Sequence, residues 1–154
     1  MKTICLLAVL AVTLIGSAAS AQTGADKDAV RLAALDYVEG IYTADPSRIE
    51  KSVHKNLTKR GFWREPADTA YRPESVMTFD QLMKLTAGWN KDGKRDTSIK
   101  EVVVLDVLDQ TASAKVVAAW GIDYMHLAKY DGRWQIINIV WQAHPPKAQT
   151  TAQR

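Results

Sequence analysis

Residues 99–143 read IKEVVVLDVLDQTASAKVVAAWGIDYMHLAKYDGRWQIINIVWQA, and this stretch decides the fold. Three of its segments, 99–108, 112–124 and 133–143, are rich in Val, Ile, Trp and Tyr, which are typical strand residues. Asp109-Gln110 and Asp131-Gly132 lie between the segments, and Asp-Gly between apolar runs predicts a β-hairpin. We therefore predict three long strands in one antiparallel sheet.

Helical patterns lie upstream of these strands. From Asp28 an apolar stripe repeats at helical spacing, and its members are Val30, Ala33, Ala34, Tyr37, Val38 and Ile41. Asp45-Pro46 then predicts the start of a second, shorter helix, with proline at its favoured first position. We expect this second helix to end near His54.

A third helix follows a short strand. Leu57–Glu65 predicts the strand, and Thr78-x-x-Gln81 is a capping box that opens the helix at Phe79. Helices that precede a sheet define an α+β architecture. The predicted fold is three N-terminal helices packed on a curved antiparallel sheet.

The first 21 residues have the pattern of a secretory signal peptide. Lys2 gives a positive start, Ile4–Ile15 is an apolar run, and Ala19-Ser20-Ala21 is a cleavage motif before Gln22. The apolar run is too short for a membrane-spanning helix, which needs about 20 residues. We therefore expect an exported protein, periplasmic or extracellular, with one domain over residues 22–146 and a disordered tail over residues 147–154.

Composition argues against several classes of partner. The formal net charge of +3 is too small for a nucleic-acid-binding face. Cys5, the single cysteine, lies in the predicted leader. No His, Asp or Glu residues have metal-ligand spacing, and no glycine-rich loop precedes a helix. We therefore expect no metal, no cofactor, no nucleic acid and, after cleavage, no membrane.

Three local runs carry a family resemblance. They are Tyr37–Tyr42 (YVEGIY), His54-x-x-Leu57-x-Lys59-Arg60 and Asp131–Ile136 (DGRWQI). In their order and spacing the chain resembles the nuclear transport factor 2-like superfamily, and within it the SnoaL-like, lumazine-binding family of small bacterial proteins. That family usually has a proline after the histidine, where this chain has Lys55.

The resemblance implies a cone-shaped fold. In such a fold a bent sheet wraps around the first helix and leaves a hollow at its wide end, and members often form homodimers by stacking their sheets. Relatives include ketosteroid isomerase, scytalone dehydratase, polyketide cyclases and limonene epoxide hydrolase. Because one fold hosts many functions, the site has to be argued from residues.

Strand alternation selects candidates for proton transfer. If 112–124 is one strand that continues to His126, then Trp120, Tyr124 and His126 share a face. Tyr124 and His126 then lie on one wall of the hollow, unless both sit at the solvated end of the sheet. Asp106 is the one acid inside a thick apolar run, and it is either an inward general base or an outward strand residue.

A second group of candidates comes from the short strand. His54 either satisfies carbonyl groups at a helix end or faces the hollow with Arg60 to hold an anionic ligand edge. In a regular strand Arg60 and Phe62 share one face, whereas Lys59 and Trp63 share the other. The sequence leaves open which pair points inward.

Aromatic residues can also line the hollow. A stacking box for a flat heterocycle would draw on Trp63, Trp89, Trp120, Trp141, Tyr37 and Tyr42. The alternative is that these side chains are ordinary core, as we expect of Trp134.

These patterns favour an exported domain that binds a small hydrophobic or heteroaromatic molecule and forms a homodimer. The ligand-binding candidates are Tyr42, His54, Arg60, Trp63, Trp120, Tyr124 and His126. One alternative is an isomerase, dehydratase or cyclase that uses Tyr124, His126 or Asp106 in acid–base catalysis. Another is a protein-interaction module whose hollow is filled by its own side chains.

Overall fold

The computed structural model describes residues 15–146, with side chains from residue 24 onward. Its elements are α1 (Ile15–Tyr42), α2 (Pro46–Ser52), β1 (Val53–Phe62), β2 (Ser75–Met77), α3 (Phe79–Trp89), β3 (Lys100–Val107), β4 (Thr111–Ala118), β5 (Gly121–Tyr130) and β6 (Arg133–Gln142). Helix α1 begins inside the predicted leader, whose first 14 residues lie outside the described residues, as does the predicted tail, 147–154. The described elements form an α+β fold, as predicted.

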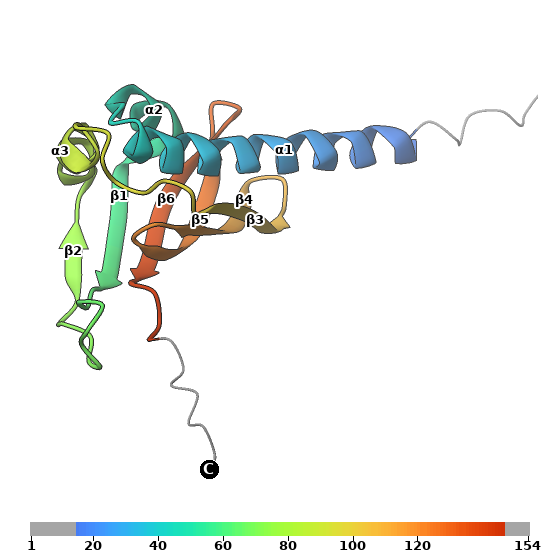
Figure 1. Ribbon diagram of the computed structural model, residues 1–154. Helices are drawn as coiled ribbons and strands as arrows, with labels where there is room; N and C mark the ends of the chain where they lie inside the picture. Colours follow the sequence, from blue (N-terminus) through green and yellow to red (C-terminus); the bar gives the residue numbers. More distant parts are fainter. Residues whose placement is uncertain (1–14, 147–154) are drawn as a thin grey trace, which may run out of the picture.

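The six strands form one curved sheet in the order β2-β1-β6-β5-β4-β3. The helices lie together on one side of it, with α1 crossing the strands (Figure 1). Neighbouring strands are antiparallel except β1 and β6, which run parallel. The prediction of a purely antiparallel sheet was therefore wrong at this pair. About 70 residues of chain separate β1 from β6, so the return connection is long enough for parallel pairing.

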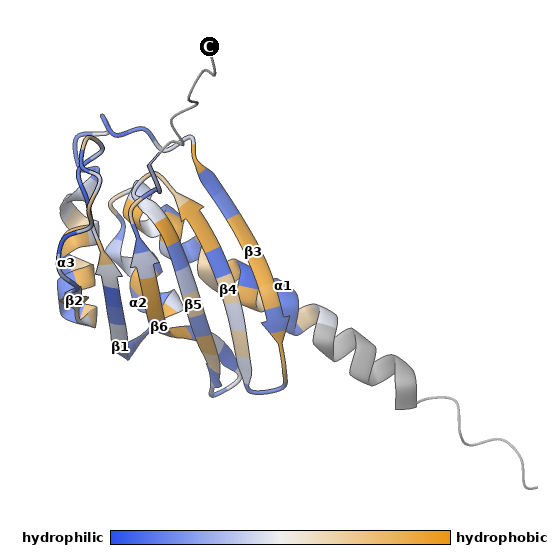
Figure 2. Ribbon diagram, turned by 90° about the horizontal axis from the view of Figure 1, so that it is seen from below, coloured by the Kyte–Doolittle hydropathy of each residue, from blue (hydrophilic) through white to orange (hydrophobic). Residues whose placement is uncertain are grey.

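The apolar stripe of α1 forms the centre of the core. Its six predicted members are all buried, and Val30, Tyr37 and Val38 have no exposed surface. They pack against inward-facing residues of the sheet such as Val116 and Ile136. No element of the described chain covers the opposite face of the sheet, which stands in front in Figure 2.

Local signals set the starts of α2 and α3 and the turn of one hairpin as predicted. Asp45 accepts a hydrogen bond from the Ser47 backbone N–H at the start of α2, and both bonds of the capping box at Thr78 are present. Asp131 and Gly132 have φ values of 49° and 76°, as a tight turn between β5 and β6 requires. Strand β2 has only three residues and was not predicted.

The predicted strand 112–124 is divided by a turn that the sequence reading missed. β4 ends at Ala118, β5 begins at Gly121, and the two residues pair directly. Gly121 has φ 145°, and a Cβ atom there would lie 2.0 Å from the carbonyl oxygen of Gln142. A glycine is therefore required at this position.

This turn reverses the alternation of inward and outward residues. The even-numbered residues of β4 face the core, whereas in β5 the odd-numbered ones do. Asp123 is consequently buried, and Tyr124 and His126 lie on the exposed face, with Tyr124 50% accessible. The prediction that Tyr124 and His126 share the face of the hollow was wrong.

Candidate functional site

A cavity of about 220 Å³ opens between the helices and the inner face of the sheet. Tryptophans make up half of its lining, and the full set is Ile41, Lys59, Trp63, Met77, Leu85, Trp89, Trp120 and Trp141. These side chains come from α1, α3, the β1–β2 region, the β4–β5 turn and β6. The cavity thus lies where α3 and the first three strands of the sheet order meet the end of α1.

One charged side chain, Lys59, lines this apolar cavity. Only 5% of Lys59 is exposed. Its ammonium donates to the hydroxyl oxygen of Tyr37 at 2.5 Å and lies 3.4 Å from Asp123 Oδ1. A buried ammonium needs such partners because desolvation of an unpaired charge is costly.

Asp123 is fully buried behind Lys59 and gathers three donors. Trp120 Nε1 donates to Asp123 Oδ2 at 2.8 Å, and the Tyr37 hydroxyl lies 3.4 Å from the same oxygen. With Lys59, these groups form a polar cluster that joins α1, β1, the β4–β5 turn and β5. Burial, followed by the charge of Asp123, raises the pKa of Tyr37 well above its usual value, so Tyr37 remains a hydroxyl donor at neutral pH.

Aromatic rings surround the ammonium. Lys59 Nζ lies 5.2 Å from the ring centroid of Tyr37, 5.9 Å from that of Trp120 and 5.5 Å from that of Trp141. Ring faces attract a cation at these distances. The rings, the carboxylate of Asp123 and the oxygen of Tyr37 thus all lie around the Lys59 ammonium.

One wall of the cavity is a group of packed aromatic rings. Trp89 stacks on Tyr42 with 5.6 Å between ring centroids and meets Trp120 edge-on at 5.5 Å. The Tyr42 hydroxyl donates to the Ile99 carbonyl oxygen and accepts from the Ala119 N–H at 2.8 Å. Tyr42 is therefore a buried support behind the wall.

The predicted aromatic box corresponds in large part to this arrangement. Trp63, Trp89, Trp120 and Trp141 line the cavity, and Tyr37 and Tyr42 lie behind it. Trp134 is buried away from it, with its Nε1 donating to Asp26 at 3.0 Å.

Other sequence candidates lie elsewhere. Asp106 is exposed and accepts a hydrogen bond from the backbone N–H of Val107, so it does not face the cavity as a buried base. Its strand has an irregular register between Val104 and Asp106. Simple alternation is lost there.

His54 and Arg60 also lie away from the cavity. His54 belongs to β1, and its ring stacks on Tyr130 at 4.3 Å. The helix-end interpretation of His54 was therefore wrong, because α2 already ends at Ser52. Arg60 is exposed and lies 3.7 Å from Glu74.

The structure decides the facing of β1 that the sequence left open. Lys59 and Trp63 point to the cavity, and Arg60 and Phe62 point to the other face. Sequence reasoning missed Asp123 because it treated the β4–β5 turn as continuous strand. The Gly121 that follows Trp120 was the available signal for a turn.

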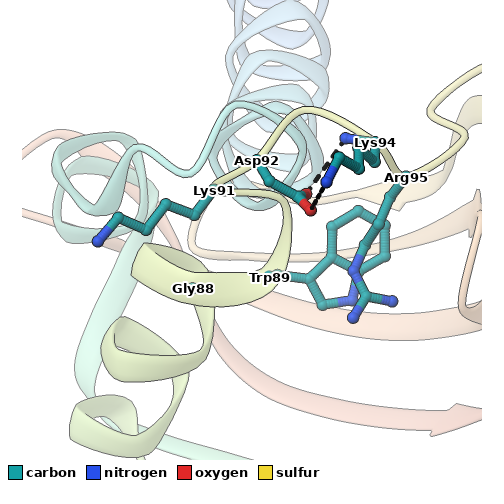
Figure 3. Close-up of a pocket in the computed structure, with 6 residues that line it drawn as sticks. All are labelled: Gly88, Trp89, Lys91, Asp92, Lys94 and Arg95. Carbon is teal, nitrogen blue, oxygen red and sulfur yellow. Dashed lines mark hydrogen bonds and ion pairs between the residues drawn. The ribbon is translucent and has the colours of Figure 1, made fainter.

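A second hollow, about 610 Å³ and wide open, lies at the end of α3. Figure 3 shows Arg95 beside the Trp89 ring, Asp92 joined to Lys94, and Lys91 pointing away from them. The Arg95 guanidinium carbon lies 4.9 Å from the Trp89 ring centroid, and the ion pair of Lys94 with Asp92 measures 3.4 Å. Trp89 is the residue that this hollow shares with the aromatic cavity.

Within residues 15–146, no three His, Cys, Asp or Glu side chains are placed to hold a metal ion. In the same part of the chain, no helix combines the length and apolar character that a membrane span needs.

The chain belongs to the lumazine-binding family that its sequence resembled. Residues 25–142 match the model of the family described as "Putative lumazine-binding". The match spans every strand and all three helices except the first turns of α1. No curated protein matches the chain.

Solved structures show the same nuclear transport factor 2-like fold. A protein of unknown function from Shewanella baltica is 17% identical with a TM-score of 0.58, covering 77% of this chain and 93% of its own. One with a cystatin-like fold from Novosphingobium aromaticivorans is 12% identical with a TM-score of 0.59, covering 88% and 92%. A protein described as a "Putative Scytalone Dehydratase" from the same species is 14% identical with a TM-score of 0.56, covering 84% of this chain and 98% of its own. The family and the fold together indicate a small-molecule-binding domain.

Proposed function

We propose that this protein is an exported binding domain for a small, flat heteroaromatic molecule held in the tryptophan-lined cavity. The observation that supports this proposal most directly is that four tryptophans line one cavity. They are Trp63, Trp89, Trp120 and Trp141. Indole faces bind flat rings through dispersion and quadrupole interactions. The description of the family supports a pteridine-like ring.

The size of the cavity limits the ligand. Drug-sized ligands occupy pockets of roughly 300–1,000 Å³, and this cavity measures about 220 Å³. One or two fused rings fit this volume better than a steroid-sized skeleton.

The lining favours binding over acid–base catalysis. No histidine or carboxylate belongs to the described residues that line the cavity, and a general base must lie within hydrogen-bond reach of its proton. Asp123 is paired with Lys59 and does not line the cavity. The residues considered for an isomerase or dehydratase, Tyr124, His126 and Asp106, do not line it either. Trp63 and Trp89 line the hollow without filling it, which speaks against a purely structural, plugged fold.

Titration with lumazine, pteridine-2,4-dione, tests the proposal. We expect saturable quenching of tryptophan fluorescence and weakening of binding by several-fold in Trp63→Ala, since one stacking contact contributes about 0.5–1.5 kcal/mol. Phe62→Ala is the matched control because Phe62 is equally exposed, 40% against 39%, but faces away from the cavity. Equal effects of the two substitutions would contradict the proposal. Native mass spectrometry of protein from its own host would identify the ligand class directly.

We also propose that the protein is exported and forms a homodimer. The leader pattern supports secretion to the periplasm or the medium, and secreted protein should begin at Gln22. The uncovered sheet face supports a homodimer, because Tyr124 and Val140 are exposed there and pair directly across β5 and β6. Light scattering of the purified protein measures the oligomeric state.

A further inference from the structure

The donors of Lys59 are not all used by the protein. An ammonium group has three N–H donors. Among the described residues, Lys59 Nζ has two hydrogen-bond acceptors, the Tyr37 hydroxyl oxygen at 2.5 Å and Asp123 Oδ1 at 3.4 Å. One donor is left over, and the side chain carrying it lines the cavity.

Contacts on several sides hold the Lys59 ammonium in place. Asp123, the oxygen of Tyr37 and three aromatic rings stabilise the ammonium. It is well suited to donate a hydrogen bond, and bonds from charged donors are stronger than neutral ones.

Lys59 is the one charged donor among the described residues that line the cavity. Ile41, Met77 and Leu85 are apolar. The indole N–H of Trp120 is already used by Asp123. A ring that enters the cavity therefore meets apolar walls and, at Lys59, one cationic donor.

We infer that Lys59 selects a ring with an exocyclic carbonyl oxygen, as in a cyclic ketone, a lactam or a pteridinedione. The carbonyl oxygen accepts the third N–H of Lys59 while the ring packs against the tryptophans. This inference rests on the proposed function and adds the chemical class of ligand. A ring of the same shape without that oxygen leaves the buried donor unpaired, which weakens its binding.

Three bicyclic probes test the selection. 4-Quinolone carries the carbonyl oxygen, 1-chloronaphthalene matches its bulk without an oxygen or an accepting ring nitrogen, and naphthalene lacks the chlorine as well. Binding is measured by NMR from the indole N–H signals of Trp89, Trp120 and Trp141. We expect 4-quinolone to bind about ten- to a hundredfold more tightly than either analogue, the range given by a hydrogen bond to a charged group.

Variants assign the discrimination to Lys59. Lys59→Met alone leaves Asp123 buried without its cation and can fail to fold, so Lys59→Met/Asp123→Asn is the second variant. It should bind the three probes with affinities within about threefold of one another. Lys115→Met, on the outward-facing side of β4, is the matched control and should keep the wild-type preference. The ¹⁵N resonance of the Lys59 ammonium should shift with 4-quinolone and not with 1-chloronaphthalene.

The possible outcomes separate the two proposals. Equal binding of all three probes to the wild type, or an unchanged preference in the double variant, overturns the role of Lys59 and leaves the aromatic cavity as a binding site. Failure of every probe to move the three indole signals overturns the proposed function, and the selection by Lys59 falls with it.

Discussion

The ammonium of Lys59 on β1 lies 3.4 Å from the carboxylate of Asp123 on β5, so this ion pair spans the intervening strand β6. Lys59 is 5% exposed and Asp123 is fully buried. Loss of one partner leaves an uncompensated buried charge, whereas loss of both leaves none.

We predict a strong asymmetry between single and double substitutions at this pair. Lys59→Met and Asp123→Asn should each lower the free energy of unfolding, Lys59→Met by about 3–5 kcal/mol. The double variant should regain much of that loss. Urea denaturation of the four proteins gives the coupling energy. Additive losses would show that the two groups do not interact in the folded state.

Gly61 and Gly88 give a second, matched pair of substitutions. A Cβ atom at Gly61 would lie 2.1 Å from Trp141 Nε1, whereas at Gly88 it meets nothing within 4 Å. Gly61→Ala should displace Trp141 from the cavity wall, cost about 1–3 kcal/mol and weaken ring binding. Gly88→Ala, in helix α3, should stabilise by about 0.5–1 kcal/mol. Thermal denaturation and the lumazine titration measure both effects, and a neutral Gly61→Ala would refute the contact.

The sequence was sufficient for the helices and most of the sheet because their signals are local. The stripe of α1, the capping box at Thr78 and the turn at Asp131-Gly132 depend only on nearby residues. The site depended on which face each strand turns inward, and a single tight turn decides that. Trp120 is a typical strand residue, so there was little sign in the sequence of the turn before Gly121. The residues of β5 were therefore assigned to the wrong faces of the sheet.

The pairing of Lys59 with Asp123 has a different cause. The two residues are 64 positions apart, and they meet because β1 and β5 both pair with β6. Parallel pairing of β1 with the last strand leaves no short-range sequence signal. The sequence therefore could not predict that Lys59 and Asp123 lie together in one polar cluster.

The buried tyrosines predict a loss of stability at alkaline pH. Burial is the first cause that raises the pKa of Tyr37 and of Tyr42 above the ordinary value near 10. Unfolded tyrosines ionise near pH 10, while the folded ones stay protonated. The contribution is therefore complete below about pH 10 and is lost as pH rises toward the folded pKa values.

Each such tyrosine should steepen the fall in unfolding free energy by up to about 1.4 kcal/mol per pH unit above pH 10. Denaturant titrations between pH 8 and 11 measure this slope. Tyr42→Phe should be less stable at neutral pH, because it loses the hydrogen bonds to Ile99 and Ala119, yet show a shallower alkaline slope. An unchanged slope would mean that Tyr42 ionises alike in both states.

The outward face of the sheet predicts a separation of self-association from ligand binding. Tyr124 and Val140 are cross-strand neighbours and are 50% and 44% exposed, on the side of the sheet opposite the cavity. Tyr124→Glu/Val140→Lys places two charges in this apolar patch. If homodimers form through this face, the variant should be monomeric by light scattering, because burying these charges on association is costly. Its affinity for lumazine should equal that of the wild type, and so should that of His126→Gln, since these side chains do not line the cavity. A monomeric variant that has lost lumazine binding would show that the two faces depend on each other, contrary to this prediction.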